Sequence, residues 1–246
     1  MRWSLALSQR LGHGLFDHAA RAADLGFDGL FVFDHLVPLA DPRAPALEAA
    51  AALGALAASS PLRVGSLVLR ATMRDPAITA SIAETVARIS PASPVIGLGA
   101  GDRLTKDETT RFGLPFPTLD DRIGRLVETV AAVRDRGVTC WVGGLHPRVV
   151  EVAARADGWN AWEADPTRLA ATLGSIDRPE GWTVSWGGRV LVGRARDDLW
   201  LSGHPEAIRE RVGALEALGV DEIVLAPLPP TDLDALERLA EVRRDR

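Results

Sequence analysis

The sequence has little of three residue types that carry much enzyme chemistry. Its 246 residues include one cysteine, Cys140, a single lysine, Lys106, and no tyrosine. One cysteine excludes an internal disulfide and a cysteine-based metal site, and its place in an apolar run predicts a buried structural thiol. The lysine falls in a predicted loop, which excludes an aldolase that forms a Schiff base on an inner strand.

Long apolar runs and concentrated charge are also absent. No segment approaches the roughly 18 uninterrupted apolar residues of a membrane span, and the N-terminal apolar run is too short for a signal peptide. We therefore expect a soluble, cytoplasmic protein without a membrane partner. The net charge of −5 is spread along the chain, which argues against a nucleic-acid partner. Neither HxH nor HExxH occurs, so no metal site is expected.

Short apolar runs alternate along the chain with segments of helical period, which predicts eight strand–helix units. Runs such as GLFVFD and RVGSLVLRA are of the kind that parallel strands buried on both faces require. This pattern predicts an α/β fold, a closed (β/α)8 TIM barrel, with a doubly wound open sheet as the alternative. Because no linker rich in Pro, Gly or Ser interrupts the pattern, we expect a single domain over residues 1–246. Predicted helices include residues 44–59, 119–136 and 147–156.

Asp34 and His35 end the second predicted strand, at the face where such barrels build their active sites. Histidine titrates near neutrality and can exchange a proton with a substrate heteroatom. The adjacent carboxylate of Asp34 is a candidate for orienting the ring. The alternative is that this polar pair ends a strand and caps the segment after it.

Two glycine-containing turns are candidate ligand sites. After the fourth strand, GLGAGD places Gly99, Ala100 and Gly101 where a flat ligand can approach the backbone, but the spacing does not match the GxGxxG fingerprint, which excludes a Rossmann dinucleotide site. After the fifth strand, Gly143 and Gly144 precede a helix, whose free N–H groups attract an anion such as phosphate. A plain strand-to-helix turn is the alternative there.

Near the sixth predicted strand, Trp159 and Trp162 are candidates for the wall of a flat pocket.

Five segments, in order, resemble the luciferase-like monooxygenases, a family of (β/α)8 barrels that depend on a flavin or a deazaflavin. The segments are AARAADLGFDGLFVFDHL, VGSLVLRATMRDPAITASIAETVARIS, GLGAG with FGLPFPTLDDRIGRLVETV, WVGGLHPRVVEVAARADGWN and SGHPEAIRERVGALEALGVDEIVL. Together they extend over nearly the whole chain.

The resemblance implies roles for particular residues. Members that use the deazaflavin F420 commonly carry an Asp-His pair after strand two, here Asp34-His35, with the histidine near the reactive carbon of the ring. The end of the third strand, around Ala71 and Thr72, would hold a backbone bulge, often with a cis peptide, that supports the ring. Asp102 falls where some deazaflavin dehydrogenases place an acidic proton donor. With the candidates above, the expected cofactor-binding residues are Ala71, Thr72, Gly99, Ala100, Gly101, Gly143, Gly144, Leu145, His146 and Trp159.

The implied activity is that of an F420-dependent oxidoreductase that transfers hydride between the cofactor and a small organic substrate, with His35 assisting proton transfer. One alternative is an FMN-dependent monooxygenase that uses O2 and reduced flavin from a separate flavin reductase. Another is a cofactor-free barrel with a binding role. Family members usually carry a further stretch before strand five, and the direct connection here predicts that the C-terminal mouth of the barrel is more open or differently covered. A homodimer, in which related barrels often pair, is a further expectation.

Overall fold

The structure is a computed structural model that describes residues 1–38 and 43–244. Eight parallel strands close into a barrel in the order β6-β5-β4-β3-β2-β1-β9-β7, with β6 pairing with β7. The predicted (β/α)8 barrel is therefore confirmed. The strands are β1 Arg2–Leu7, β2 Gly29–Val32, β3 Arg63–Arg70, β4 Val95–Gly99, β5 Thr139–Gly143, β6 Gly158–Trp162, β7 Thr183–Val192 and β9 Glu222–Pro227, with a short β8, Ser202–Gly203, beside the end of β7.

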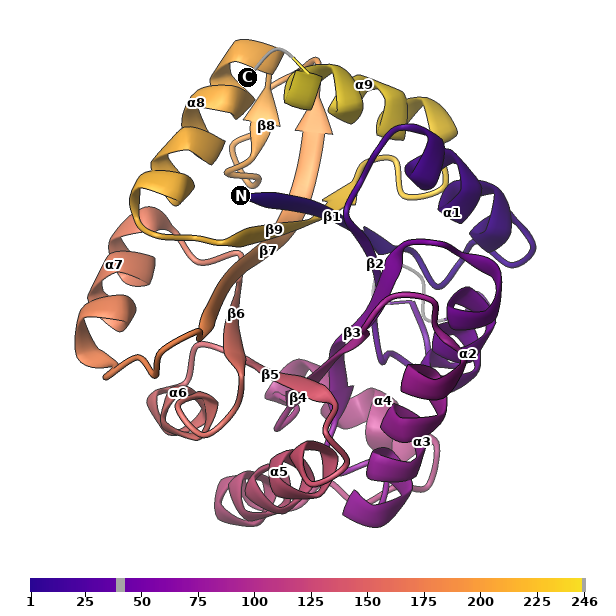
Figure 1. The fold of residues 1–246 in the computed structure, drawn as a ribbon, viewed down its shortest axis with the longest axis vertical. Helices are drawn as coiled ribbons and strands as arrows, with labels where there is room; N and C mark the ends of the chain where they lie inside the picture. The colour runs from indigo at the N-terminus through magenta and orange to yellow at the C-terminus, as the bar shows by residue number, and fades with distance from the viewer. Residues whose placement is uncertain (39–42, 245–246) are drawn as a thin grey trace.

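Helices surround the strands on the outside (Figure 1). They are α1 Gly14–Asp24, α2 Ala49–Ser59, α3 Pro76–Ile89, α5 Leu119–Arg134, α6 Pro147–Ala153, α7 Pro166–Ser175, α8 Pro205–Ala217 and α9 Leu233–Arg244. A 3-10 turn, η1 Arg103–Thr105, and a short helix, α4 Lys106–Arg111, lie in the connection between β4 and α5. Several helices begin with proline after a polar cap; Asp75, for example, accepts a hydrogen bond from Ala77 N–H.

Alternation along the strands creates two apolar layers. One lies between the sheet and the helices and includes Cys140, which is buried as predicted. The other fills the barrel interior with six buried side chains: Ala6, Phe31, Leu67, Val95, Trp141 and Val224. Within it, the rings of Phe31 and Trp141 stack with centroids 5.8 Å apart. The barrel is thus a packed core, with room for ligands only beyond its ends.

A carboxylate closes the N-terminal end of the barrel. Glu222, the first residue of β9, is fully buried. It accepts a hydrogen bond from Ser4 Oγ at 2.7 Å and from Arg2 Nε at 2.9 Å, and it forms an ion pair with Arg63. The Arg63 guanidinium also lies 5.7 Å from the centroid of the Trp141 ring. These contacts satisfy the buried charge and seal this end.

The structure corrects several predicted boundaries. The helix expected over residues 44–59 begins at Ala49, the one expected over 147–156 ends at Ala153, and α5 ends at Arg134. The chain then enters β5 at Thr139 without an inserted segment, as the sequence indicates. The single domain over residues 1–246 stays a prediction, because residues 39–42 and 245–246 lie outside the described residues.

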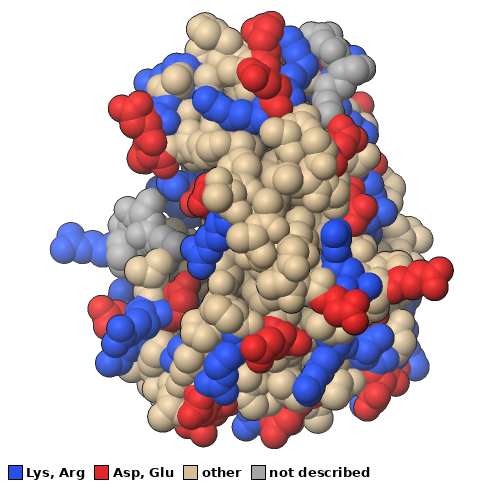
Figure 2. Space-filling model, turned by 90° about the vertical axis from the view of Figure 1, so that its left-hand side faces the viewer, with Lys and Arg blue, Asp and Glu red and all other residues tan. Residues whose placement is uncertain are grey.

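Surface charge on one side of the molecule is mixed. Figure 2 shows that basic and acidic side chains intermingle on the face on which α7 lies, without a stripe of one sign. Among the described residues, no helix has the length and apolar character needed to cross a membrane.

Candidate active site

His35 follows β2 at the C-terminal end of the barrel strands. Gln9, in the connection between β1 and α1, holds its backbone: the Gln9 amide donates to the His35 carbonyl at 2.8 Å and accepts from the His35 N–H at 3.3 Å. The side chain of His35 is 25% exposed. Its Nε2 has no protein partner among the described residues, and this atom is not fully buried. One ring nitrogen is therefore open at the mouth.

The other ring nitrogen of His35 faces a glutamate. Nδ1 lies 3.2 Å from Oε2 of Glu108, a residue of α4 in the connection between β4 and α5. Oε1 of Glu108 accepts from Arg70 Nη2 at 2.8 Å and also from the backbone N–H of Leu36. Arg70 and Glu108 are each only 5% exposed at the side chain. A buried, fully paired carboxylate thus fixes the orientation of the imidazole ring.

Asp34 has a different role from the expected one. Its carboxylate turns away from His35 and accepts from Arg70 N–H at 2.8 Å and from both Nη atoms of Arg74, at 2.9 and 3.0 Å. Arg74 also pairs with Glu48. Burial alone would lower the pKa of Arg74, but the hydrogen bonds and charge of Asp34 and Glu48 outweigh it and raise that pKa. Asp34 therefore ties the end of β2 to β3, and Glu108 is the carboxylate on His35.

Apolar side chains form a wall beside His35. Phe33, Val68, Trp162 and Ala226 are partly buried and pack against the barrel interior. The rings of Phe33 and Trp162, from opposite sides of the barrel, meet edge to face with centroids 5.3 Å apart. Phe33 lies 6.4 Å from the His35 ring, centroid to centroid. This wall, which we call the mouth wall, gives a flat ligand an apolar surface next to a titratable group.

Of the two tryptophans considered for the wall, Trp162 belongs to it and Trp159 does not. Trp159 is fully buried on the helix side of β6, and its Nε1–H donates to the carbonyl of Gly144 at 2.8 Å. Residues at odd separations along a strand point to opposite faces, which separates the two positions. The expected direct contact between Trp159 and a ligand in the mouth is therefore wrong: this side chain supports the turn at Gly144.

The β-bulge of β3 lies earlier than expected. Register with β4 shifts between Ser66 and Leu69, and the Leu67–Val68 peptide is cis. Ala71, where the bulge was expected with Thr72, instead continues the ladder by donating to Gly99 O at 2.9 Å.

The bulge brings Val68 against one glycine of the adjacent strand β4 and one of β5, the strand beyond it. A Cβ built at Gly99 would lie 2.5 Å from Val68 Cγ2, and one at Gly143 would lie 2.6 Å from Val68 Cγ1. The side chains of Ala71 and Ala100 are buried in the helix-side core instead. Thus Gly99 and Gly143 lie at the mouth, whereas those two alanines can reach it only through their backbones.

Asp102 caps a turn. Its carboxylate is exposed and accepts from the N–H groups of Leu104 at 2.9 Å and Thr105 at 3.2 Å, at the start of η1. Gly101, just before it, has φ +71°, a conformation that favours glycine. No contact joins Asp102 to His35 among the described residues, so its expected role as a proton donor stays a prediction.

The turn from Gly143 to His146 leads into α6 as predicted. The N–H of Gly144 already donates to Asn160 O at 3.2 Å, and His146 Nδ1 accepts from Arg148 N–H at 3.3 Å. The N–H groups of Leu145 and His146 have no acceptor among the described residues. Arg168 Nη2 donates to Leu145 O at 3.3 Å. Two backbone donors and the guanidinium of Arg168 can thus bind an anion, whereas the N–H of Gly144 is already paired.

Comparison with known proteins decides the family. The sequence model of a family described as luciferase-like monooxygenase matches residues 8–137. The chain belongs to this family. An F420-dependent glucose-6-phosphate dehydrogenase of Intrasporangium calvum is 32% identical over 137 residues, 54% of this chain and 40% of that protein. A protein of the same description from Microbacterium testaceum is 33% identical over 141 residues, 56% and 40% of the two chains. The chain spans about 40% of the length of these curated relatives.

Solved structures share the barrel of this luciferase-like chain. An F420-dependent secondary alcohol dehydrogenase in complex with an F420–acetone adduct has a TM-score of 0.80 and 17% identity, over 98% of both chains. The monooxygenase RslO1 from Streptomyces bottropensis has a TM-score of 0.76 and 16% identity, over 100% of this chain and 99% of that one. At such identities the likeness concerns the fold.

Sequence reasoning missed Glu108 in this luciferase-like site. The signal was a short helical piece whose buried face is polar: Thr105, Glu108 and Thr109 stand at helical spacing and are all nearly inaccessible. Thr109 Oγ1 accepts from Arg70 Nη1 at 3.2 Å. A polar stripe turned inward needs partners from another element. Those partners are Arg70 and His35, which the sequence alone does not place beside α4.

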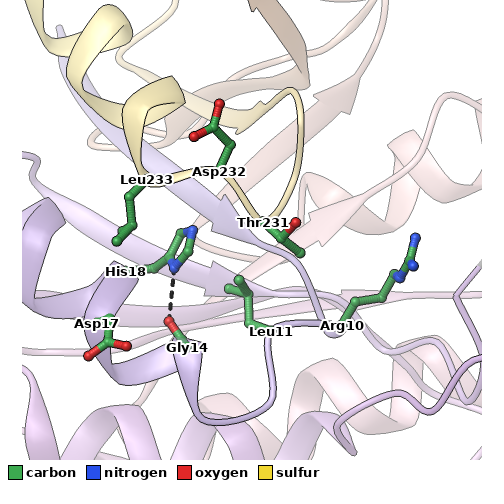
Figure 3. A pocket seen from close by; sticks show the side chains of 8 residues that line it. All are labelled: Arg10, Leu11, Gly14, Asp17, His18, Thr231, Asp232 and Leu233. Atoms are coloured by element: carbon green, nitrogen blue, oxygen red, sulfur yellow. Dashed lines mark hydrogen bonds between the residues drawn. The ribbon is translucent and has the colours of Figure 1, made fainter.

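A separate cavity of about 430 Å³ lies between the β1–α1 and β9–α9 connections of this luciferase-like barrel (Figure 3). Its lining includes Arg10, Asp17, His18 and Asp232, but not His35. His18 Nδ1 lies 2.9 Å from Gly14 O, while its buried Nε2 has no hydrogen-bond partner within the part of the chain that the structure describes. The candidate active site is therefore the mouth around His35, and this cavity is distinct from it.

Proposed function

We propose that this chain binds F420 at the barrel mouth and transfers hydride between that cofactor and a small organic substrate, with His35 exchanging a proton with the substrate oxygen. The observation that carries the proposal is the arrangement of His35: hydrogen bonds hold its backbone and its Nδ1, whereas its Nε2 is accessible to a substrate. Relatives described as F420-dependent dehydrogenases support the choice of cofactor. So does the similar fold that holds an F420–acetone adduct.

The residues present fit such a cofactor. The mouth wall supplies apolar contacts, and Gly99 and Gly143 keep the strand ends free of side chains beside Val68. The N–H groups of Leu145 and His146 would hold the phosphate, with Arg168 adding positive charge. When bound, F420 supplies the carbon that accepts or gives up the hydride.

The chain's own residues provide the proton chemistry and the surroundings. His35 Nε2 takes a proton from a substrate hydroxyl during oxidation, or returns it to a carbonyl oxygen during reduction. Phe33 and Trp162 exclude water from beneath the reacting groups, which strengthens local electrostatic interactions. Gln9 and Glu108 keep the imidazole in place, so that little reorganisation accompanies the transfer.

Titration of the purified protein with F420, FMN and FAD, followed by fluorescence, tests the choice of cofactor. We expect saturable binding of F420 and much weaker binding of the two flavins. If the protein binds FMN but not F420, the proposed function is wrong and a flavin-dependent monooxygenase takes its place. A flavin reductase is then the expected partner. Binding of none would leave a cofactor-free barrel. The homodimer and the cytoplasmic location stay predictions.

Substitution of His35 tests the proton role. In His35→Ala, we expect turnover of a responsive alcohol, measured by the change in F420 absorbance, to fall by about 10²–10⁴-fold. Binding of F420 should stay within about tenfold, or about 1.4 kcal/mol. His204→Ala is the matched control, because His204 is exposed and its side chain makes no capping bond. Unchanged turnover in His35→Ala would remove His35 from the mechanism.

A further inference from the structure

His35 meets an acceptor on one side of its ring. Oε2 of Glu108 lies 3.2 Å from Nδ1, and the other oxygen, Oε1, receives two donors, the Leu36 N–H and Arg70 Nη2. All three groups around this carboxylate must donate, because an ionised carboxylate only accepts. Nδ1 of neutral His35 therefore carries the ring proton, and Nε2 carries the lone pair.

We propose that Glu108 is a positioning residue that fixes His35 in the Nδ1–H tautomer, so that Nε2 acts as the base in the oxidation of an alcohol. The tautomer follows from the contacts of the free protein, whereas the assignment of an alcohol substrate rests on the proposed function. In the step, the hydroxyl proton moves to His35 Nε2, the carbonyl C=O forms, and the hydride leaves the carbinol carbon for oxidised F420. The alcohol is oxidised and F420 is reduced.

A merely structural Glu108 would tie α4 to the segment after β2 without selecting a tautomer. The isosteric variant Glu108→Gln separates the two roles. Because Leu36 N–H and Arg70 both need an acceptor, the amide oxygen of the substituted side chain must occupy the Oε1 position. Its amide NH2 then faces Nδ1 of His35, which must become an acceptor. The proton therefore moves to Nε2, and the base is lost without a change in shape.

NMR spectra of the cofactor-free protein with isotope-labelled histidine report which ring nitrogen carries the proton. We expect the Nδ1–H form at His35 in the wild-type protein and the Nε2–H form in Glu108→Gln. His35→Gln identifies the signal by its loss. His18 and His146 are internal references, because Nδ1 of His18 faces the Gly14 carbonyl, whereas Nδ1 of His146 accepts from Arg148 N–H. Asp107→Asn, on the exposed neighbouring position of α4, should leave the His35 signal unchanged.

The outcome is decisive even if Glu108→Gln folds poorly, because the wild-type tautomer alone can overturn the proposal. An Nε2–H form in the wild type, or an unchanged tautomer in a folded Glu108→Gln, would contradict it. With F420 and an alcohol, Glu108→Gln should lower kcat at least about tenfold while KM stays within about threefold. If F420 does not bind, the proposed function fails, but the tautomer result still stands or falls by itself.

Discussion

At the N-terminal end of the barrel, Glu222 meets donors from Arg2, Ser4 and Arg63 and is sealed from solvent. At the C-terminal end, Glu108 is nearly as buried and also binds an arginine, but its third partner is His35, whose far nitrogen is open. Both ends bear the cost of burying a carboxylate. At the closed end the buried carboxylate holds neighbouring strands together, whereas at the open end it orients the imidazole ring of His35.

The closed end should be the more important for stability. Glu222→Gln keeps the shape of the side chain but removes the charge that compensates Arg63, which is 17% exposed. We expect the free energy of unfolding, measured by urea denaturation, to fall by about 3–5 kcal/mol. Binding of F420 per folded molecule should not change, because the two ends are separated by the packed barrel interior.

Glu151→Gln is the matched control for this substitution, because Glu151 is exposed on α6. Its unfolding free energy should change by no more than about 0.5 kcal/mol. A loss in Glu222→Gln as small as that of the control would break the contrast between the two ends.

At the open end, both stability and F420 binding should be sensitive to an added side chain at the mouth. In Gly143→Ala, the new Cβ would lie 2.6 Å from Val68 Cγ1, and a β-branched valine has little freedom to rotate away. We expect a loss of about 1–3 kcal/mol in unfolding free energy, together with weaker F420 binding. Gly124→Ala on the exposed face of α5 meets nothing within 4 Å and should stabilise by about 0.5–1 kcal/mol. Unaltered F420 binding in Gly143→Ala would place the ligand elsewhere.

The sequence predicts the barrel because periodicity is a local property of the chain. Apolar runs and helical segments alternate with the same order as the observed strands and helices, and Gly143 to His146 falls in the strand-to-helix turn expected for it. Strand ends also locate His35 at the mouth. Helix boundaries were less accurate, as at Ala49, because capping interactions rather than periodicity decide where a helix begins.

Contacts between distant segments could not be predicted from the same pattern. Because Asp34 precedes His35 in the sequence, it was expected to be the carboxylate that orients the ring. Instead, Asp34 pairs with Arg74, and the carboxylate on His35 is that of Glu108, from the connection between β4 and α5. The side to which a strand residue points depends on register, which separated the roles of Trp159 and Trp162. The β-bulge around Leu67 and Val68 likewise depends on pairing with β4.

Cys140, the second residue of β5, is a probe with which the effects of substitutions at both ends can be compared. Burial raises the pKa of its thiol, and the Asp157 carboxylate adds to this effect, so the reactive thiolate is scarce in the folded protein. Labelling by a thiol reagent should therefore follow opening of the sheet. Glu222→Gln should speed it by about 10²-fold or more, since each 1.4 kcal/mol of lost stability is a factor of about ten. His35→Ala, with its partly exposed ring, should change the rate by less than about threefold. Equal acceleration in both variants would mean that His35 holds the fold together as Glu222 does, and the open end would lose its distinct role.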